Sequence, residues 1–197
     1  MSDDRIADRT IDSFLSGVAA SAVAPSAGAV AAVTGSMGAA LCEMVAIHTS
    51  EPTASLTDAR HDLAADREQL LELADADAAA VDTVQTAFED GSETDYPQAA
   101  LQRATTVPLR IAEACATVAE HAVAVAEEGT RNAVVDVAVG ARIARTALAS
   151  AATIVRENLD LIDDESFVAD ARRRLDDAEE AADTALTAVA AGTGIEG

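Results

Sequence analysis

The chain has 197 residues, half of them hydrophobic and only 2% aromatic, and its formal net charge is −22 at pH 7. All 13 basic residues are Arg, and the sequence contains no Lys. Phosphate binding needs clustered Lys and Arg, so this charge argues against nucleic acid and against an anionic membrane surface as partners. Multimolar salt makes a dense acidic surface tolerable by screening its repulsion, so we expect a salt-adapted protein; the alternative is an acidic protein from an ordinary cell.

The hydrophobic pattern predicts an all-α fold, a bundle of about six helices with Ala-rich packing. Ala and Val dominate, and no stretch shows the period-two alternation that is typical of strands. The expected helices span residues 10–24, 29–48, 57–89, 97–128, 132–158 and 167–191. They form one domain over 1–197, with a disordered tail at 192–197. The Ala-rich faces exceed what one protomer can cover, so we expect a homodimer.

The N-terminal third is apolar enough to be considered for a membrane. However, residues 14–47 are interrupted by Pro25, several glycines and Glu43, and a spanning helix needs about 20 continuous apolar residues. The first residues, Ser2-Asp3-Asp4, are acidic and do not resemble a signal peptide. We therefore expect a cytoplasmic protein in which Cys42 and Cys115 are free, buried thiols.

Carboxylates that interrupt apolar stripes are the candidate catalytic groups. Asp75, Asp77 and Asp82 lie in the middle of the 57–89 helix, and Asp77 falls inside its apolar stripe. Burial raises the pKa of such a group, which suits proton transfer near neutral pH. Asp136 opens the otherwise apolar 132–158 helix, where the helix dipole alone would favour an acidic residue. The alternative for all four is a solvated carboxylate on a very acidic surface.

Other catalytic motifs are absent from the sequence. It contains no HExxH, no ExxH pair and no His/Cys cluster, so we expect no metal site. It also contains no nucleotide-binding loop, so we expect no permanently bound cofactor. His48 ends the second expected helix, and His121 lies on an apolar face, where a histidine is more often a core residue than a ligand.

Taken together, five segments resemble the cyclodeaminase/cyclohydrolase family, which includes the C-terminal domain of formiminotransferase-cyclodeaminase and the stand-alone methenyltetrahydrofolate cyclohydrolases. The resemblance covers residues 11–189, and its specificity lies in the order and spacing of the segments. They are Phe14-Leu15; the run 24–45 containing Pro25-Ser26-Ala27-Gly28; Asp75-Ala76-Asp77-Ala78; Val107-Pro108-Leu109 with Ala112-Glu113; and Gly129 to Asp136, followed by residues 155–159.

The resemblance implies an all-helical homodimer that acts on a tetrahydrofolate derivative without a metal. It implies that Asp136, with Asp77 or Asp75, moves protons, and that Asn132 orients substrate or water. The turn at Pro25, Ser26 and Gly28 would offer backbone N–H groups to the folate, and Arg131 and Arg156 would meet its glutamate tail.

Three functions follow from this resemblance. The first is hydrolysis of 5,10-methenyltetrahydrofolate to the 10-formyl form, favoured because the sequence carries no formiminotransferase segment. The second is formiminotetrahydrofolate cyclodeaminase activity. The third is a non-catalytic folate-binding or scaffold relative, because Ser26, Ala27 and Ala29 replace two glycines and a serine of the usual Pro-Gly-Gly-Gly-Ser turn.

Overall fold

The computed structural model describes residues 5–90 and 98–195, and all regular structure within them is helical. The predicted all-α class and the six α-helices are confirmed. The elements are η1 (Ile6–Asp8), α1 (Ile11–Val18), α2 (Ala27–Ile47), α3 (Ala54–Asp90), α4 (Gln98–Glu128), η2 (Arg131–Ala133), α5 (Val134–Leu159) and α6 (Glu165–Thr193).

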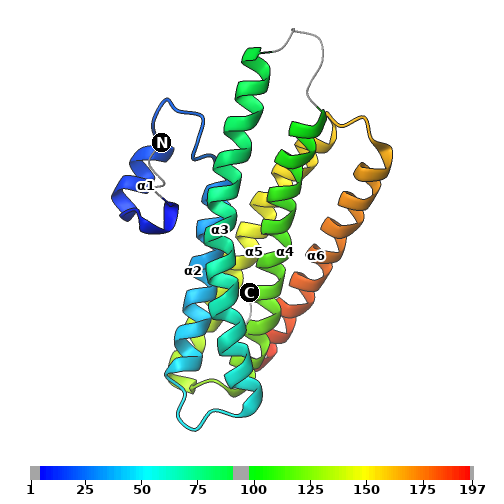
Figure 1. Cartoon of the computed structure of the whole chain (residues 1–197). Helices are drawn as coiled ribbons and strands as arrows, with labels where there is room; N and C mark the ends of the chain where they lie inside the picture. Colours follow the sequence, from blue (N-terminus) through cyan, green and yellow to red (C-terminus); the bar gives the residue numbers. More distant parts are fainter. Residues whose placement is uncertain (1–4, 91–97, 196–197) are drawn as a thin grey trace.

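Helices α2 to α6 run alternately up and down in one bundle, with consecutive helices antiparallel (Figure 1). Helix α2 packs along α3 and α5, while α4 packs along α3, α5 and α6. The core between them consists mainly of Ala, Val and Leu side chains. Helix α1 lies to one side of the bundle (Figure 1). The five long helices therefore form the scaffold that any site must use.

Small residues allow α2 and α5 to approach closely. A Cβ atom at Gly38 would lie 2.6 Å from the backbone oxygen of Gly140, and a Cβ atom at Gly140 would lie 2.7 Å from Sγ of Cys42. Real Cβ atoms do not approach other atoms this closely, so the crossing requires glycine on both helices. The face of α2 that carries Gly38 therefore packs directly on α5.

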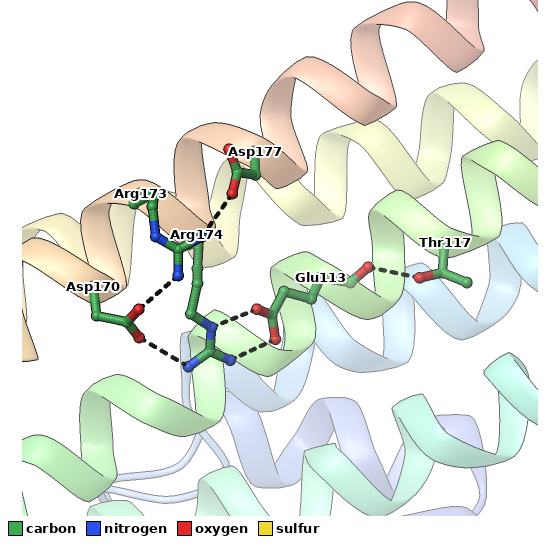
Figure 2. A network of polar contacts seen from close by, with 6 residues as sticks. All are labelled: Glu113, Thr117, Asp170, Arg173, Arg174 and Asp177. Atoms are coloured by element: carbon green, nitrogen blue, oxygen red, sulfur yellow. Dashed lines mark hydrogen bonds and ion pairs between the residues drawn. The ribbon is translucent and has the colours of Figure 1, made fainter.

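Ion pairs join the outer helix α6 to α4. Arg174 of α6 donates two hydrogen bonds of 2.8 Å to the carboxylate of Glu113 on α4. Figure 2 shows this pair beside Arg173, which bridges Asp170 and Asp177 along α6. Bidentate pairing fixes the register of the two helices, although partly exposed pairs of this kind contribute only about 1 kcal/mol or less.

The first expected helix is shorter than predicted. We expected it to continue to residue 24, but α1 ends at Val18. A helix of two turns is marginal without packing, and α1 makes few contacts with the bundle. The C-terminal tail also differs, because Gly192 and Thr193, expected to be disordered, are the last residues of α6. Residues 196–197 of that tail lie outside the described residues.

Candidate active site

A pocket of about 430 Å³ lies where α2 is missing from the upper part of the bundle. Helix α2 begins only at Ala27, whereas α3 continues beyond that level to Asp90 (Figure 1). Pro25 forces the preceding residue out of the helical region, so the chain cannot extend α2 upward from this point. The space that α2 leaves is lined by α3, α4, the end of α5 and the turn before α2. Its lining residues are Val23, Ser26, Ala27, Gly28, Asp77, Ala80, Val81, Val84, Gln85, Leu101, Ala104, Ile154, Asn158 and Leu161.

Asp77 is the buried charge of this pocket, with only 4% of its surface exposed. Its Oδ2 accepts a hydrogen bond of 2.8 Å from the backbone N–H of Ala29 and one of 3.3 Å from the hydroxyl of Ser26. The side chain of Ser26 makes no capping bond of its own. Asp77 thus caps α2 from a neighbouring helix, satisfying one of the N–H groups left free in the first turn.

Burial raises the pKa of Asp77 above the ordinary value of 3.8, even though both hydrogen bonds act in the opposite direction. Desolvation is the largest cause, because a carboxylate against apolar walls loses its water. A carboxylate with a raised pKa accepts a proton more readily than an ordinary aspartate does. The carboxylate predicted from the break in the apolar stripe is therefore buried, has a raised pKa and lines the pocket.

Gly28 makes room for this carboxylate. A Cβ atom at residue 28 would lie 2.0 Å from Oδ1 of Asp77 and within 2.6 Å of its other carboxylate atoms. The first turn of α2 can therefore approach Asp77 only with glycine at this position. Of the predicted binding residues, Ser26 and Gly28 line the pocket, and Pro25 is buried directly before them.

Asp75 faces away from the pocket and contacts the N-terminal segment. Its Oδ1 accepts a hydrogen bond of 2.8 Å from the backbone N–H of Ile6, and its Oδ2 lies 3.7 Å from Nε of Arg5. Two residues along a helix is about 200° of rotation, so Asp75 and Asp77 face different sides of α3. The structure therefore uses Asp75 to hold η1 against α3, and Asp75 does not line the pocket.

The remaining predicted residues also lie outside the pocket. Arg131 and Asn132 are exposed on η2, and Asp136 is in the first turn of α5. Asn158, which lines the pocket, is near the other end of the same helix, about 33 Å away at 1.5 Å per residue. Arg156 points toward α6, where it pairs with Glu179. The first turn of α5 is where the helix dipole favours an acidic residue, which accounts for the placement of Asp136.

Asn158, at the end of α5, lines the pocket but was not among the predicted site residues, although it lies in the segment 155–159 that carries part of the family resemblance. Its Nδ2 donates a hydrogen bond of 3.0 Å to the backbone oxygen of Ala104 on α4. Nothing local in the sequence separates Asn158 from the polar residues around it, since its importance depends on which helix α5 packs against.

His121 belongs to a cluster between α3 and α4. Its Nδ1 lies 2.8 Å from Asp66 and its Nε2 lies 3.7 Å from Asp62. The hydrogen bond with Asp66 is the main reason that the pKa of His121 is raised, and burial only partly opposes it. No group of three or more His, Cys, Asp or Glu side chains within residues 5–90 and 98–195 is arranged to hold a metal ion.

The two cysteines are free and buried, as predicted, and burial raises the pKa of each thiol to about 12. Two elements, α2 and the segment 131–159, are long and apolar enough to cross a membrane by composition alone. Half of each is buried inside the bundle, and both are core helices of the fold.

Comparison with known proteins places this chain in a family. Residues 10–177 match the family model described as formiminotransferase-cyclodeaminase. The chain therefore belongs to the formiminotransferase-cyclodeaminase family. It is 34% identical over 188 residues to a methenyltetrahydrofolate cyclohydrolase of Methylorubrum extorquens, covering 86% of this chain and 88% of that protein.

The fold also matches a solved structure. The formiminotetrahydrofolate cyclodeaminase of Thermotoga maritima superposes with a TM-score of 0.88 and 26% sequence identity, over 96% of this chain and 98% of that one. The relatives thus include both activities that the sequence resemblance implied.

Proposed function

We propose that the chain is a methenyltetrahydrofolate cyclohydrolase, which hydrolyses 5,10-methenyltetrahydrofolate to 10-formyltetrahydrofolate in the cytoplasm. The observation that carries this proposal is the buried carboxylate of Asp77 in a pocket within the usual size range for small-molecule sites. The 34% identity to a cyclohydrolase over most of both chains supports this reaction over that of the cyclodeaminase.

The reaction needs one group that moves a proton beside a cationic carbon. Water attacks the amidinium carbon between N5 and N10 of the substrate, and Asp77 accepts the proton that the water loses. The bond from this carbon to N5 then breaks as the proton passes from Asp77 to N5. The hydroxyl group on the same carbon releases its proton to solvent and becomes the carbonyl of the formyl group on N10. The negative charge of Asp77 also favours binding of the cation.

The test is loss of the methenyltetrahydrofolate absorbance with purified protein, measured against the uncatalysed rate. Asp77→Asn keeps an acceptor for the N–H of Ala29 but removes the base, so we expect turnover to fall about 10²- to 10⁴-fold. Asp82→Asn, at an exposed position of the same helix, is the matched control. In the wild type, turnover should also fall as the pH drops through the raised pKa of Asp77. Full activity in Asp77→Asn would refute the assignment.

The second candidate is formiminotetrahydrofolate cyclodeaminase, which the structural likeness to the Thermotoga maritima enzyme favours. Release of ammonia from 5-formiminotetrahydrofolate, without hydrolysis of the methenyl substrate, would select this activity. Turnover of neither substrate would select the non-catalytic folate-binding relative.

We also propose that the protein is a homodimer. Large apolar side chains are exposed beside the close crossing of α2 and α5: Met37 is 48% exposed, Val135 59% and Val139 40%. Exposed apolar side chains on two neighbouring helices are the type of surface that a second copy covers. A contact between subunits would also offer Asp136 and Asn132, which lie outside the pocket of their own chain, a route to the pocket of a second copy.

Light scattering after size exclusion measures the oligomeric state directly. We expect the wild type to have twice the mass of one chain and Val139→Glu to be monomeric, since the variant places a charge in the proposed interface. Thr187→Glu on the exposed face of α6 should remain a dimer. A monomeric wild type would rule the proposal out.

A further inference from the structure

Pro108 leaves an unsatisfied carbonyl in the middle of α4. Proline has no backbone N–H, so the carbonyl oxygen four residues earlier, that of Ala104, has no helical donor. Pro108 is buried, and Ala104 lines the pocket. A buried carbonyl without a donor is costly, so a partner is expected from elsewhere in the fold.

Asn158 supplies that partner from α5. Its Nδ2 donates a hydrogen bond of 3.0 Å to the oxygen of Ala104. Because a carbonyl oxygen can only accept, the amide NH₂ group must face α4, and this fixes the orientation of the whole amide. Within the described part of the chain, Oδ1 of Asn158 has no hydrogen-bond partner in the protein.

We propose that Asn158 is a specificity-determining residue, which accepts a hydrogen bond through Oδ1 from an N–H group of the substrate's pterin ring. This inference rests on the proposed function. Asn158 and Asp77 reach the pocket from α5 and α3, and both present acceptor oxygens to it. A reduced pterin carries N–H donors at N3, at N8 and at its 2-amino group, so the acceptor oxygen of Asn158 matches this donor-rich ring while Asp77 faces the reacting carbon.

Pro108 is then a positioning residue: it does not contact the substrate itself and acts on substrate binding through Asn158. It acts by freeing the oxygen of Ala104, which holds the Asn158 amide in the orientation that presents Oδ1. Pro108→Ala would restore a backbone N–H that donates to the oxygen of Ala104. This N–H would compete with the hydrogen bond from Asn158 and weaken it. The same change should not harm the helix, since proline is the least favourable residue in a helix interior.

The experiment measures kcat and KM for 5,10-methenyltetrahydrofolate in four proteins: wild type, Asn158→Leu, Pro108→Ala and the double variant. We expect Asn158→Leu to raise KM about 10-fold with kcat within about 2-fold, since the pterin contact is the same in ground and transition states. Pro108→Ala should raise KM about 3-fold alone and have no further effect when leucine occupies position 158. Glu157→Gln, at the adjacent exposed position, is the control and should match the wild type.

A purely structural role for Asn158 would lower the melting temperature and leave KM unchanged, and that result would overturn the inference. Independent, additive effects of the two substitutions would overturn the positioning role of Pro108. If Asn158→Leu fails to fold, Pro108→Ala tests the inference instead. An unchanged KM of the folded Pro108→Ala variant refutes the inference, and a raised KM of this variant supports it. Absence of both turnover and tetrahydrofolate binding in the wild type, measured by calorimetry, would instead mean that the proposed function is wrong.

Discussion

Gly28 and Asp77 depend on one another at the atomic scale, because the carboxylate occupies the volume that any other residue 28 would need for its Cβ atom. We expect Gly28→Ala to displace the Asp77 carboxylate from its bond with Ala29 and to lower turnover about 100-fold. Helix α2 itself should remain, because alanine favours a helix more than glycine does.

The methenyltetrahydrofolate assay and circular dichroism together check this prediction. Gly17→Ala is the matched control, since its new Cβ atom would meet its nearest neighbour at an ordinary 3.5 Å. Equal turnover in the two variants would mean that the carboxylate does not need its observed position.

Single residues also show what could be predicted from sequence. Asp77 was identifiable because a carboxylate interrupts an apolar stripe, and local periodicity records that directly. The same signal at Asp136 is also what the helix dipole favours in a first turn, and periodicity cannot separate the two causes. The contact of Asn158 was not predictable, because its hydrogen-bond partner is a carbonyl on a different helix.

At the scale of helices, His121 joins α4 to α3 through Asp66, and this contact makes the stability of the bundle dependent on pH. Asp66, Asp62 and Glu120 all favour the charged imidazole, so its pKa is raised in the folded state above the ordinary value of 6.5. The stabilisation is therefore fully present below about pH 6.5 and is lost as the pH rises through the raised pKa.

We expect His121→Gln to lower the free energy of unfolding by about 1 kcal/mol at pH 6 and by less at pH 9. Urea unfolding at the two pH values measures the difference. His61→Gln, at an exposed position of α3, should have little effect at either pH. A loss for His121→Gln that does not change with pH would show that the contact is not ionic.

Helix boundaries were predictable wherever a helix is held by the core. The ends expected for the second to sixth helices agree with the structure within three residues, because Pro, Gly and acidic caps act locally. The first helix was misjudged because its length depends on packing against the bundle, which the sequence does not record.

For the whole molecule, the net charge of −22 is the dominant feature. Carboxylates far outnumber the arginines that could pair with them, so repulsion among them destabilises the compact state in dilute buffer. We expect the melting temperature to rise between 0.1 and 2 M KCl, by about 2–4 °C for each kcal/mol of repulsion that the salt screens.

Calorimetry in a KCl series checks this expectation, with sucrose at matched osmolality as the control for a general effect of cosolutes. A flat or falling melting temperature would argue against adaptation to salt and would favour an ordinary acidic protein. Composition alone motivates this prediction. It concerns the charge of the surface, which the packing of the bundle core does not determine.

The pocket exists because α2 stops short, beneath Pro25, and the helices around it continue. A descendant of this chain with a helix-forming residue in place of Pro25 could extend α2 upward by about two turns and fill the cavity from within. Such a change would abolish turnover by closing the pocket. The bundle and the lining side chains of α3, α4 and α5 would stay as they are. In a genome survey, loss of this proline would therefore be an economical marker of family members that keep the architecture but have abandoned turnover.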